Sequence, residues 1–321
     1  MNTDELKKYL QTLHIDMQDN DNALKFLTAK PYTNFYLTTA GVGFKRLSLI
    51  KELLFGSYQL GFFRLYALKH FLFSKKVKLE DEKYLIIHNF WSQGYHHWLA
   101  EALLKLIVFN ANYSEYTLLL PASYSAFAKQ SLDKFKFKDI VYLEEQCIYH
   151  IPNGVVINNP KSGFFYDEHI KQLKDFYLST SSNPFRKIYI SRRNETLRRI
   201  VNEKDIYPLL IENGYEIIEP QLLSFQEQVT LFSEAVEIIA IHGAALTNIV
   251  FMQQGARVVE LYREVTANDL INGCYYRLAQ AAKLKYEMCF LKIGNKHKDI
   301  DRSDLIISKN EFALLLTSNN N

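Results

Sequence analysis

The sequence predicts an α/β protein whose open, parallel sheets are covered by helices. Strand-like and helix-like patterns alternate from Tyr116 onward and again through the second half of the chain. Residues 236–241 are short, apolar and β-branched, as is typical of a buried parallel strand. That stretch ends in a turn of small residues, 242–245, which opens a helix. Such turns are frequent ligand-binding sites, since free backbone N–H groups at a helix start favour anions.

The first 80 residues are the least regular part of the chain. Residues 4–13 predict a short amphipathic helix, and the polar residues that follow predict a loop. Residues 47–73 are rich in Leu, Phe and Tyr, and the basic run 75–78 follows them. We interpret this region as a buried aromatic segment with a solvated basic end. The alternative is a patch for a membrane surface, because such patches combine basic and aromatic residues on a helix.

A polar stripe marks the helix predicted at residues 97–109, which follows a strand at 84–88 and a loop. The helix is apolar on most of its circumference, and its polar residues His97, Glu101 and Lys105 are spaced four apart. The stripe either meets water or faces a cleft. In the second case an imidazole and a carboxylate lie side by side where a proton must be moved.

The remaining elements of the first half alternate up to a linker. Strands are predicted at 117–120, 140–143, 147–151 and 155–157, with helices at 122–135 and 166–178. Residues 179–184 are small and polar and end in Pro, as is typical of a linker. The sequence therefore predicts two domains, residues 1–180 and 181–321.

The second half repeats the alternation with clearer helix signals. Gly214 ends one predicted helix, and Ser224 and Glu227 form a capping box that begins the next. A strongly basic loop, 192–199, follows the first strand. The predicted strands are 187–191, 215–218, 236–241, 257–261 and 286–291, and the predicted helices are 202–213, 225–235, 246–252, 269–283 and 308–316.

Composition excludes several classes of protein. The formal net charge is +3, from 38 basic and 35 acidic residues, too balanced for a nucleic-acid binder that depends on phosphate neutralisation. The cysteines Cys147, Cys274 and Cys289 lack the spacing of a disulfide framework or a zinc site, which favours a reducing cytoplasm. The first residues do not resemble a signal sequence, and no apolar run is long enough to span a membrane. We expect a cytoplasmic protein, with peripheral contact to the inner membrane face as the alternative.

An ordered set of motifs in the second half resembles glycosyltransferase family 61. The motifs are Ile-Tyr-Ile-Ser-Arg-Arg at 188–193, Arg-Arg-Ile-Val-Asn-Glu at 198–203, Gly-Tyr-Glu-Ile-Ile at 214–218, Leu-Ser-Phe-Gln-Glu-Gln at 223–228, His-Gly-Ala-Ala-Leu-Thr-Asn at 242–248 and Val-Val-Glu-Leu at 258–261. In the first half, Tyr-His-His-Trp-Leu-Ala-Glu at 95–101 is similar to a further segment of that family. The resemblance implies a GT-B-like fold, in which two Rossmann-type domains with parallel sheets face a cleft. It also implies inverting transfer of a sugar from a nucleotide donor without an essential metal.

The resemblance and the residue chemistry together predict a donor site in residues 181–321. A metal-free site must stabilise the departing nucleoside diphosphate with Arg, His, Lys and helix N-termini. The predicted nucleotide-sugar-binding residues are Arg192, Arg193, His242, Gly243, Ala244, Ala245, Thr247, Asn248 and Glu260. Glu260 either binds a pair of ribose or sugar hydroxyls or pairs with an arginine. Ala245 departs from the glycine that is frequent in the family, which matters only if the backbone there has a positive φ.

The predicted acceptor side, residues 1–180, supplies the catalytic base. An inverting displacement needs a group that takes the acceptor hydroxyl's proton. We favour Glu101, partly desolvated on an apolar helix, with His97 one turn away to orient it. The reverse assignment, in which Glu101 holds His97 as the base, is a close second. In a purely structural interpretation, the pair only pins the helix to the neighbouring loop.

The predicted function is hexosyl or pentosyl transfer from a nucleotide sugar to a glycan acceptor, free or lipid-linked, in capsule, exopolysaccharide or lipopolysaccharide assembly. The alternative is a non-catalytic relative that binds nucleotides or glycans. An NAD-dependent enzyme would need a Gly-x-Gly-x-x-Gly motif after a strand, and a metallohydrolase would need clustered ligands such as His-Glu-x-x-His. Neither pattern occurs. The sequence thus predicts no metal, no cofactor and no nucleic-acid partner.

Overall fold

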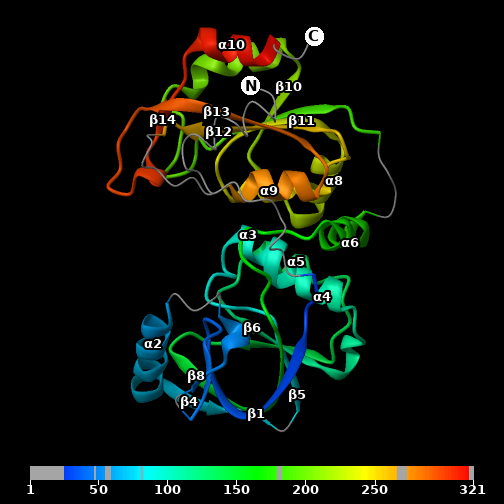
Figure 1. Ribbon diagram of the computed structural model, residues 1–321, viewed down its shortest axis with the longest axis vertical. Coiled ribbons are helices and arrows are strands. Elements are labelled where there is room, and N and C mark those ends of the chain that lie inside the picture. Colours follow the sequence, from blue (N-terminus) through cyan, green and yellow to red (C-terminus); the bar gives the residue numbers. More distant parts are fainter. Residues whose placement is uncertain are drawn as a thin grey trace. The chain divides into compact units, whose positions relative to one another are not determined.

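The computed structural model describes residues 25–46, 48–54, 59–80, 82–178, 183–265 and 273–317. Within these ranges the chain divides into an N-terminal unit that ends at Phe176 and a C-terminal unit that begins at Tyr177 (Figure 1). The predicted helix at 4–13 lies outside the described residues. So do residues 179–182, which contain the predicted domain boundary. Each unit is a mixed arrangement of helices around one sheet.

The C-terminal unit contains a six-stranded sheet whose first five strands in spatial order are parallel. The order is β10-β9-β11-β12-β13-β14, and only β14 runs antiparallel to its neighbour. The strands are β9 (Arg186–Ile190), β10 (Tyr215–Ile218), β11 (Ala235–Ile241), β12 (Arg257–Arg263), β13 (Lys285–Ile293) and β14 (Leu305–Ile306). The parallel core confirms the parallel sheet that alternating strands and helices predict for this half.

Helices cover both faces of this sheet. They are α7 (Tyr207–Glu212), α8 (Phe225–Ser233), α9 (Cys274–Ala281) and α10 (Lys309–Thr317). Leu210 of α7 and Phe312 of α10 pack with Tyr189, Ile239 and Val259 in one core cluster. Helices α8 and α9 lie on the opposite face (Figure 1). Side chains alternate between the two faces along a strand. The residues directly before and after Tyr189, Ile239 and Val259 therefore point toward α8 and α9.

The N-terminal unit contains an eight-stranded mixed sheet in the order β3-β2-β1-β8-β5-β6-β7, with β4 also paired to β8. The strands are β1 (Ala29–Thr38), β2 (Gly43–Lys45), β3 (Ser48–Leu49), β4 (Lys75–Lys78), β5 (Lys83–Ile86), β6 (Thr117–Pro121), β7 (Asp139–Leu143) and β8 (Cys147–Ile157). Pairs among β4 to β8 are parallel, whereas β1 pairs antiparallel with β8 and β2. The expectation of a parallel sheet in this half is therefore wrong for the strands β1 to β3, which pair antiparallel.

The helices of the N-terminal unit differ from their predicted bounds. They are α2 (Leu60–Phe73), α3 (Tyr95–His97), α4 (Leu104–Phe109), α5 (Ala126–Gln130) and α6 (Asp167–Tyr177). A π-helix at Trp98–Leu103 joins α3 to α4, so the predicted helix at 97–109 exists with an altered middle. The helix predicted at 122–135 is confined to α5. Residues 147–157 form one strand rather than two.

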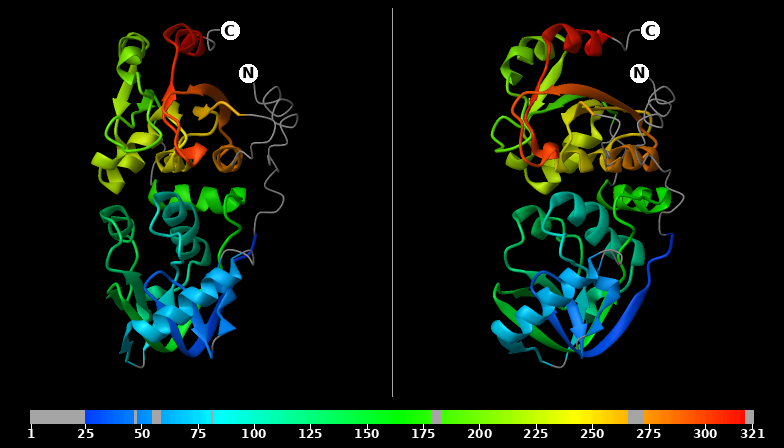
Figure 2. Two further views of the ribbon diagram at one scale, coloured as in Figure 1. Left: turned by 90° about the vertical axis from the view of Figure 1, so that its left-hand side faces the viewer. Right: turned by 60° about the vertical axis from the view of Figure 1, so that its left-hand side comes forward.

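The sequence suggested that the aromatic region before residue 80 is a buried segment. In the structure it is only partly buried. Phe63 and Ala67 of α2 are buried, but several apolar side chains of the helix are exposed. The helix lies along one side of the unit (Figure 2). No described helix is long and apolar enough to cross a bilayer.

Candidate active site

The C-terminal unit gathers basic side chains where the order of its parallel strands reverses. Strand β9 is flanked by β10 on one side and by β11 on the other, so the chain leaves β9 in one direction and later returns in the opposite direction. Ligands of open α/β sheets bind beyond the carboxyl ends of strands at such a switch point. Arg192 follows β9 and His242 follows β11. Both residues therefore occupy that edge.

Arg192 is held against the turn after β11. Its Nε donates to the carbonyl of Arg198 at 3.1 Å and its Nη2 to that of Leu197 at 3.2 Å. A Cβ added to Gly243 would lie only 2.7 Å from Arg192 Nη1, so the glycine leaves room for the guanidinium. Burial, and next the charge of Arg198, lower the pKa of Arg192. Two neighbouring cations, one of them largely desolvated, favour an anion, and the carboxylate of Glu195 lies 3.9 Å from Arg192 Nη2.

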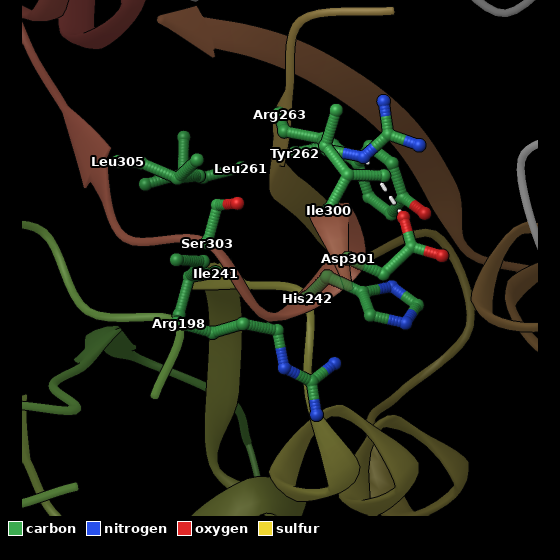
Figure 3. Close-up of a pocket in the computed structure, with 10 residues that line it drawn as sticks. All are labelled: Arg198, Ile241, His242, Leu261, Tyr262, Arg263, Ile300, Asp301, Ser303 and Leu305. Carbon is green, nitrogen blue, oxygen red and sulfur yellow. Dashed lines mark hydrogen bonds and ion pairs between the residues drawn. The ribbon is translucent and has the colours of Figure 1, made fainter. Parts of the chain in front are cut away.

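Arg198 itself lines a pocket with His242. Its backbone has a φ of 55°, in the left-handed region, and no carboxylate pairs with its guanidinium among the described residues. In Figure 3 its side chain extends beneath the His242 ring. The other residues that line this pocket come from the ends of β11, β12 and β14 and from the loop before β14: Ile241, Leu261, Tyr262, Arg263, Ile300, Asp301, Ser303 and Leu305. Arg263 is neutralised by Asp301 at 2.8 Å, which leaves Arg198 as a cation of the pocket with no acidic partner.

His242 is oriented by a buried carboxylate. Its Nδ1 donates to Glu260, and the other oxygen of Glu260 accepts a hydrogen bond from Tyr286. Burial, then the Glu260 charge, raise the pKa of Tyr286 well above its ordinary value, so the phenol remains a donor. The His242 ring also makes edge contacts with Tyr262 and Tyr275. These contacts fix the orientation of the ring. Nε2, the nitrogen not bonded to Glu260, is then available to hydrogen-bond a ligand in the pocket.

Several predicted donor-site residues have other partners. Arg193 is half exposed, bonds Glu219 at 2.6 Å and lines a separate surface depression, so it does not join Arg192. Both oxygens of Glu260 accept hydrogen bonds, one from His242 and one from Tyr286, and no arginine pairs with it among the described residues. Asn248 is buried and donates to Gln228 and to the Ala245 carbonyl.

The short helix after the turn is a 3-10 helix, Ala244–Phe251, rather than the predicted helix at 246–252. Thr247 is buried within it and hydrogen-bonds Tyr275. Ala245 does not have a positive φ, so the departure from glycine carries no backbone strain. Ala244 begins the helix directly after Gly243, and its N–H group lies at the strand edge.

Arg198 was not among the site residues predicted from the sequence. The direction of its side chain depends on the backbone conformation of its loop, which the sequence pattern does not report.

The N-terminal unit brings His97 and Glu101 together as predicted. His97 Nδ1 donates to Glu101 Oε2 at 2.7 Å. The two side chains differ in exposure, at 30% for His97 and 1% for Glu101. The second carboxylate oxygen, Oε1, is buried without a hydrogen-bond partner among the described residues. The π-helix contains Glu101, and such irregular turns are frequent at functional sites.

The third residue of the polar stripe, Lys105, is completely buried. Its Nζ donates to the carbonyl of Ile87 at 2.7 Å and to the side chain of Asn159. Burial lowers the pKa of Lys105 to about 7, an effect that the nearby Glu101 carboxylate opposes. The stripe therefore does not simply meet water, because two of its three members lie inside the unit.

The fold and this arrangement define an α/β protein with a group of basic side chains at the switch point of a parallel sheet. No group of three or more potential His, Cys, Asp or Glu metal ligands occurs among the residues that the structure describes. The family model described as Glycosyltransferase 61 matches residues 95–259, more than half of the 321 residues. The chain belongs to glycosyltransferase family 61. The match contains Arg192, Arg198 and His242 as well as His97 and Glu101.

A curated relative points to the same chemistry. The chain is similar to the EGF domain-specific O-linked N-acetylglucosamine transferase of Drosophila melanogaster, with 27% identity over 144 residues. The match covers 41% of this chain and 26% of the relative. The chain thus spans about a quarter of the length of that relative. Glycosyl transfer is the general activity that both comparisons support.

Proposed function

We propose that this chain is an inverting, metal-independent glycosyltransferase that moves a hexosyl or pentosyl group from a nucleotide sugar to a glycan acceptor. The proposed setting is the cytoplasmic assembly of capsule, exopolysaccharide or lipopolysaccharide, on a free or lipid-linked acceptor. Family membership supports the reaction type. Cys147 and Cys289 form no disulfide within the described part of the chain, which supports a reducing compartment.

The observation that carries the proposal is the group formed by Arg192, Arg198 and His242 at the β9–β11 edge. Two guanidinium groups and an oriented imidazole supply charge and hydrogen-bond donors without a metal. Such groups stabilise the negative charge that grows on a nucleoside diphosphate as the sugar departs. The backbone N–H groups at the start of the 3-10 helix Ala244–Phe251 are further donors for the negative charge of a diphosphate.

In this proposal the N-terminal unit supplies the base, and the geometry favours His97 over Glu101. A buried carboxylate cannot approach an acceptor hydroxyl, whereas the partly exposed imidazole can. Glu101 then holds Nδ1 and orients the ring, and Nε2 takes the acceptor proton as the hydroxyl attacks the sugar carbon. The bond from that carbon to the diphosphate breaks, and the diphosphate leaves with its electron pair.

Nucleotide binding tests the donor site directly. Nucleoside diphosphates with different bases are first ranked by thermal shift, since a ligand of the folded state raises the melting temperature. Calorimetry with the best ligand then compares Arg198→Ala with Arg193→Ala. We expect Arg198→Ala to weaken binding by the ~1.5–3 kcal/mol of a charged hydrogen bond. Arg193→Ala is the matched control, because its guanidinium already pairs with Glu219.

Equal losses in the two variants, or none in Arg198→Ala, would move the diphosphate away from this pocket. Binding that is intact in a protein without transfer activity toward any nucleotide sugar would instead favour a non-catalytic relative.

A further inference from the structure

Helix α2 exposes an apolar face that the described residues of the N-terminal unit leave uncovered. The opposite side of the helix packs through Phe63 and Ala67 into a core cluster with Val42 and Phe44. The exposed apolar side chains range from 42% exposure for Leu68 to 81% for Phe73, and the full set is Phe62, Leu65, Leu68, Leu72 and Phe73. Their spacing places them along one side of the helix. The exposed Lys69 lies on the same side of the helix, among these apolar side chains. A soluble protein rarely exposes so large an apolar surface without a use for it.

Basic side chains border this face, and an acidic group that acts on it comes from elsewhere in the chain. Burial, and next the charge of the exposed Glu145, raise the pKa of Tyr66. Between residues 60 and 78 the chain contains no Asp or Glu. All its Lys and Arg side chains there are exposed: Arg64, Lys69, Lys75, Lys76 and Lys78. Strand β4 carries three of them and follows α2 after a single residue. Lys76 Nζ lies 4.2 Å from the centre of the Phe71 ring, which holds that cation beside the helix.

We propose that this surface, the exposed side chains of α2 together with the lysines of β4, docks on an anionic lipid bilayer. Exposed Leu and Phe side chains on a membrane surface enter the boundary between headgroups and acyl chains. The surrounding lysines and arginines are attracted to lipid phosphates and would not meet repulsion from any carboxylate of residues 60–78. A protein partner would need a matching apolar and acidic surface, whereas an anionic bilayer offers both properties everywhere.

The docking surface is connected to the candidate base. The Phe90 ring contacts Phe62 at 5.7 Å and Tyr66 at 5.4 Å, and the next residue, Trp91, contacts Phe90 at 5.3 Å and His97 at 6.2 Å between ring centres. A row of rings thus runs from α2 to His97. If the proposed function holds, docking brings a lipid-linked acceptor near the base. Docking itself does not depend on that function.

Flotation with vesicles tests the surface without donor or acceptor. The whole chain is mixed with vesicles of phosphatidylcholine alone or with phosphatidylglycerol added, at low and at high salt. We expect the wild type to float with the anionic vesicles only, and less at high salt because ions screen the attraction. Leu65→Glu/Leu72→Glu should reduce binding by about tenfold or more. Lys75→Ser/Lys76→Ser, which leaves α2 unchanged, should reduce it by about fivefold per lysine.

The matched control is Ile211→Glu/Leu314→Glu, which alters net charge equally at two exposed apolar positions of the C-terminal unit. It should bind within about twofold of the wild type. Equal loss in this control, or equal binding to neutral vesicles, overturns the proposal. Dissociation of an oligomer by Leu65→Glu/Leu72→Glu, without vesicle binding by the wild type, assigns the surface to a second copy. A lowered melting temperature in that variant, again without vesicle binding, assigns it to another segment of this chain.

Discussion

His97 and Glu101 carry the acid–base hypothesis at the scale of single residues. Both sit at predicted positions, but their roles depend on burial, which differs sharply between neighbours one turn apart. The sequence favoured Glu101 as the base because its helix is apolar. The same apolar surroundings enclose the carboxylate so fully that only His97 remains partly exposed.

Chemical rescue separates the two assignments. We expect His97→Ala to lower kcat by about 10²–10⁴-fold, the usual contribution of a positioned base, and added imidazole to restore part of it. Imidazole should not restore Glu101→Ala. Nucleotide affinity, measured by calorimetry, is the control and should be unchanged in both variants. Rescue of Glu101→Ala by formate, without rescue of His97→Ala by imidazole, would make Glu101 the base. Unfolding of both variants would support the structural interpretation.

Lys105 predicts a pH dependence of stability. Its pKa falls to about 7 on folding from an ordinary value of 10.5. Between these values the unfolded chain binds more protons than the folded chain, so stability rises with pH. The contribution is fully favourable above about 10.5 and is lost as the pH falls through about 7. One such group gives a slope of at most about 1.4 kcal/mol per pH unit.

Urea unfolding of Lys105→Met across this pH range measures the effect. We expect the variant to lack the rise, so that its stability relative to the wild type is greatest near neutral pH and shrinks toward alkaline pH. Lys51→Met, at an exposed lysine of the same unit, should show a constant difference. A parallel pair of curves for Lys105→Met and wild type would contradict a lysine that loses its proton on folding.

At the scale of elements, the sequence correctly predicts a helix start where the capping residues are close neighbours in the chain. Ser224 caps α8, and both hydrogen bonds of its capping box with Glu227 form. The similar pair at the start of α10 is weaker, since Glu311 N lies 3.5 Å from the Ser308 hydroxyl. The two starts therefore differ in strength, although their sequence patterns look alike.

Substitution of the two caps tests this difference. Ser224→Ala should lower the free energy of unfolding by about 1 kcal/mol, a typical loss for an N-cap. Ser308→Ala should cost clearly less, because its bond is at the limit of hydrogen-bond length. Thermal or urea unfolding of both variants provides the comparison, and an equal or larger loss in Ser308→Ala would contradict it.

The helix at residues 95–109 shows where local signals stop. Its apolar periodicity correctly indicates helical chain, yet the π-helix at Trp98–Leu103 interrupts the regular hydrogen bonding. Trp98 is fully buried and donates through its indole N–H to Ser131 at 2.9 Å. Irregular turns of this kind depend on contacts with distant residues, which periodicity does not report.

For the whole molecule, metal independence is the prediction with the clearest outcome. The proposed donor site uses Arg192, Arg198 and His242 in the part that a divalent cation would otherwise play. We expect sugar transfer to be unchanged after treatment with EDTA and dialysis. The same preparation supplemented with Mg²⁺ or Mn²⁺ is the control. Activity that disappears with EDTA and returns with either ion would disprove this part of the proposal.

The sequence by itself determined the α/β class, most strands of the C-terminal sheet and the residues at the ends of β9 and β11. These features are local, because a strand pattern followed by a turn of small residues identifies a strand end without any knowledge of its neighbours. His97 and Glu101 could be paired for the same reason, since residues four apart share one side of a helix.

Only the tertiary structure decided which strands are neighbours and which side chains share the pocket. Strand order placed β9 beside β11, and the left-handed backbone of Arg198 turned its side chain toward His242, while Arg193 turned to Glu219. The antiparallel strands β1 to β3 and the exposed face of α2 were decided in the same way. Each depends on contacts between residues far apart in the chain, and hydrophobic patterns report only that a side is buried, not what covers it.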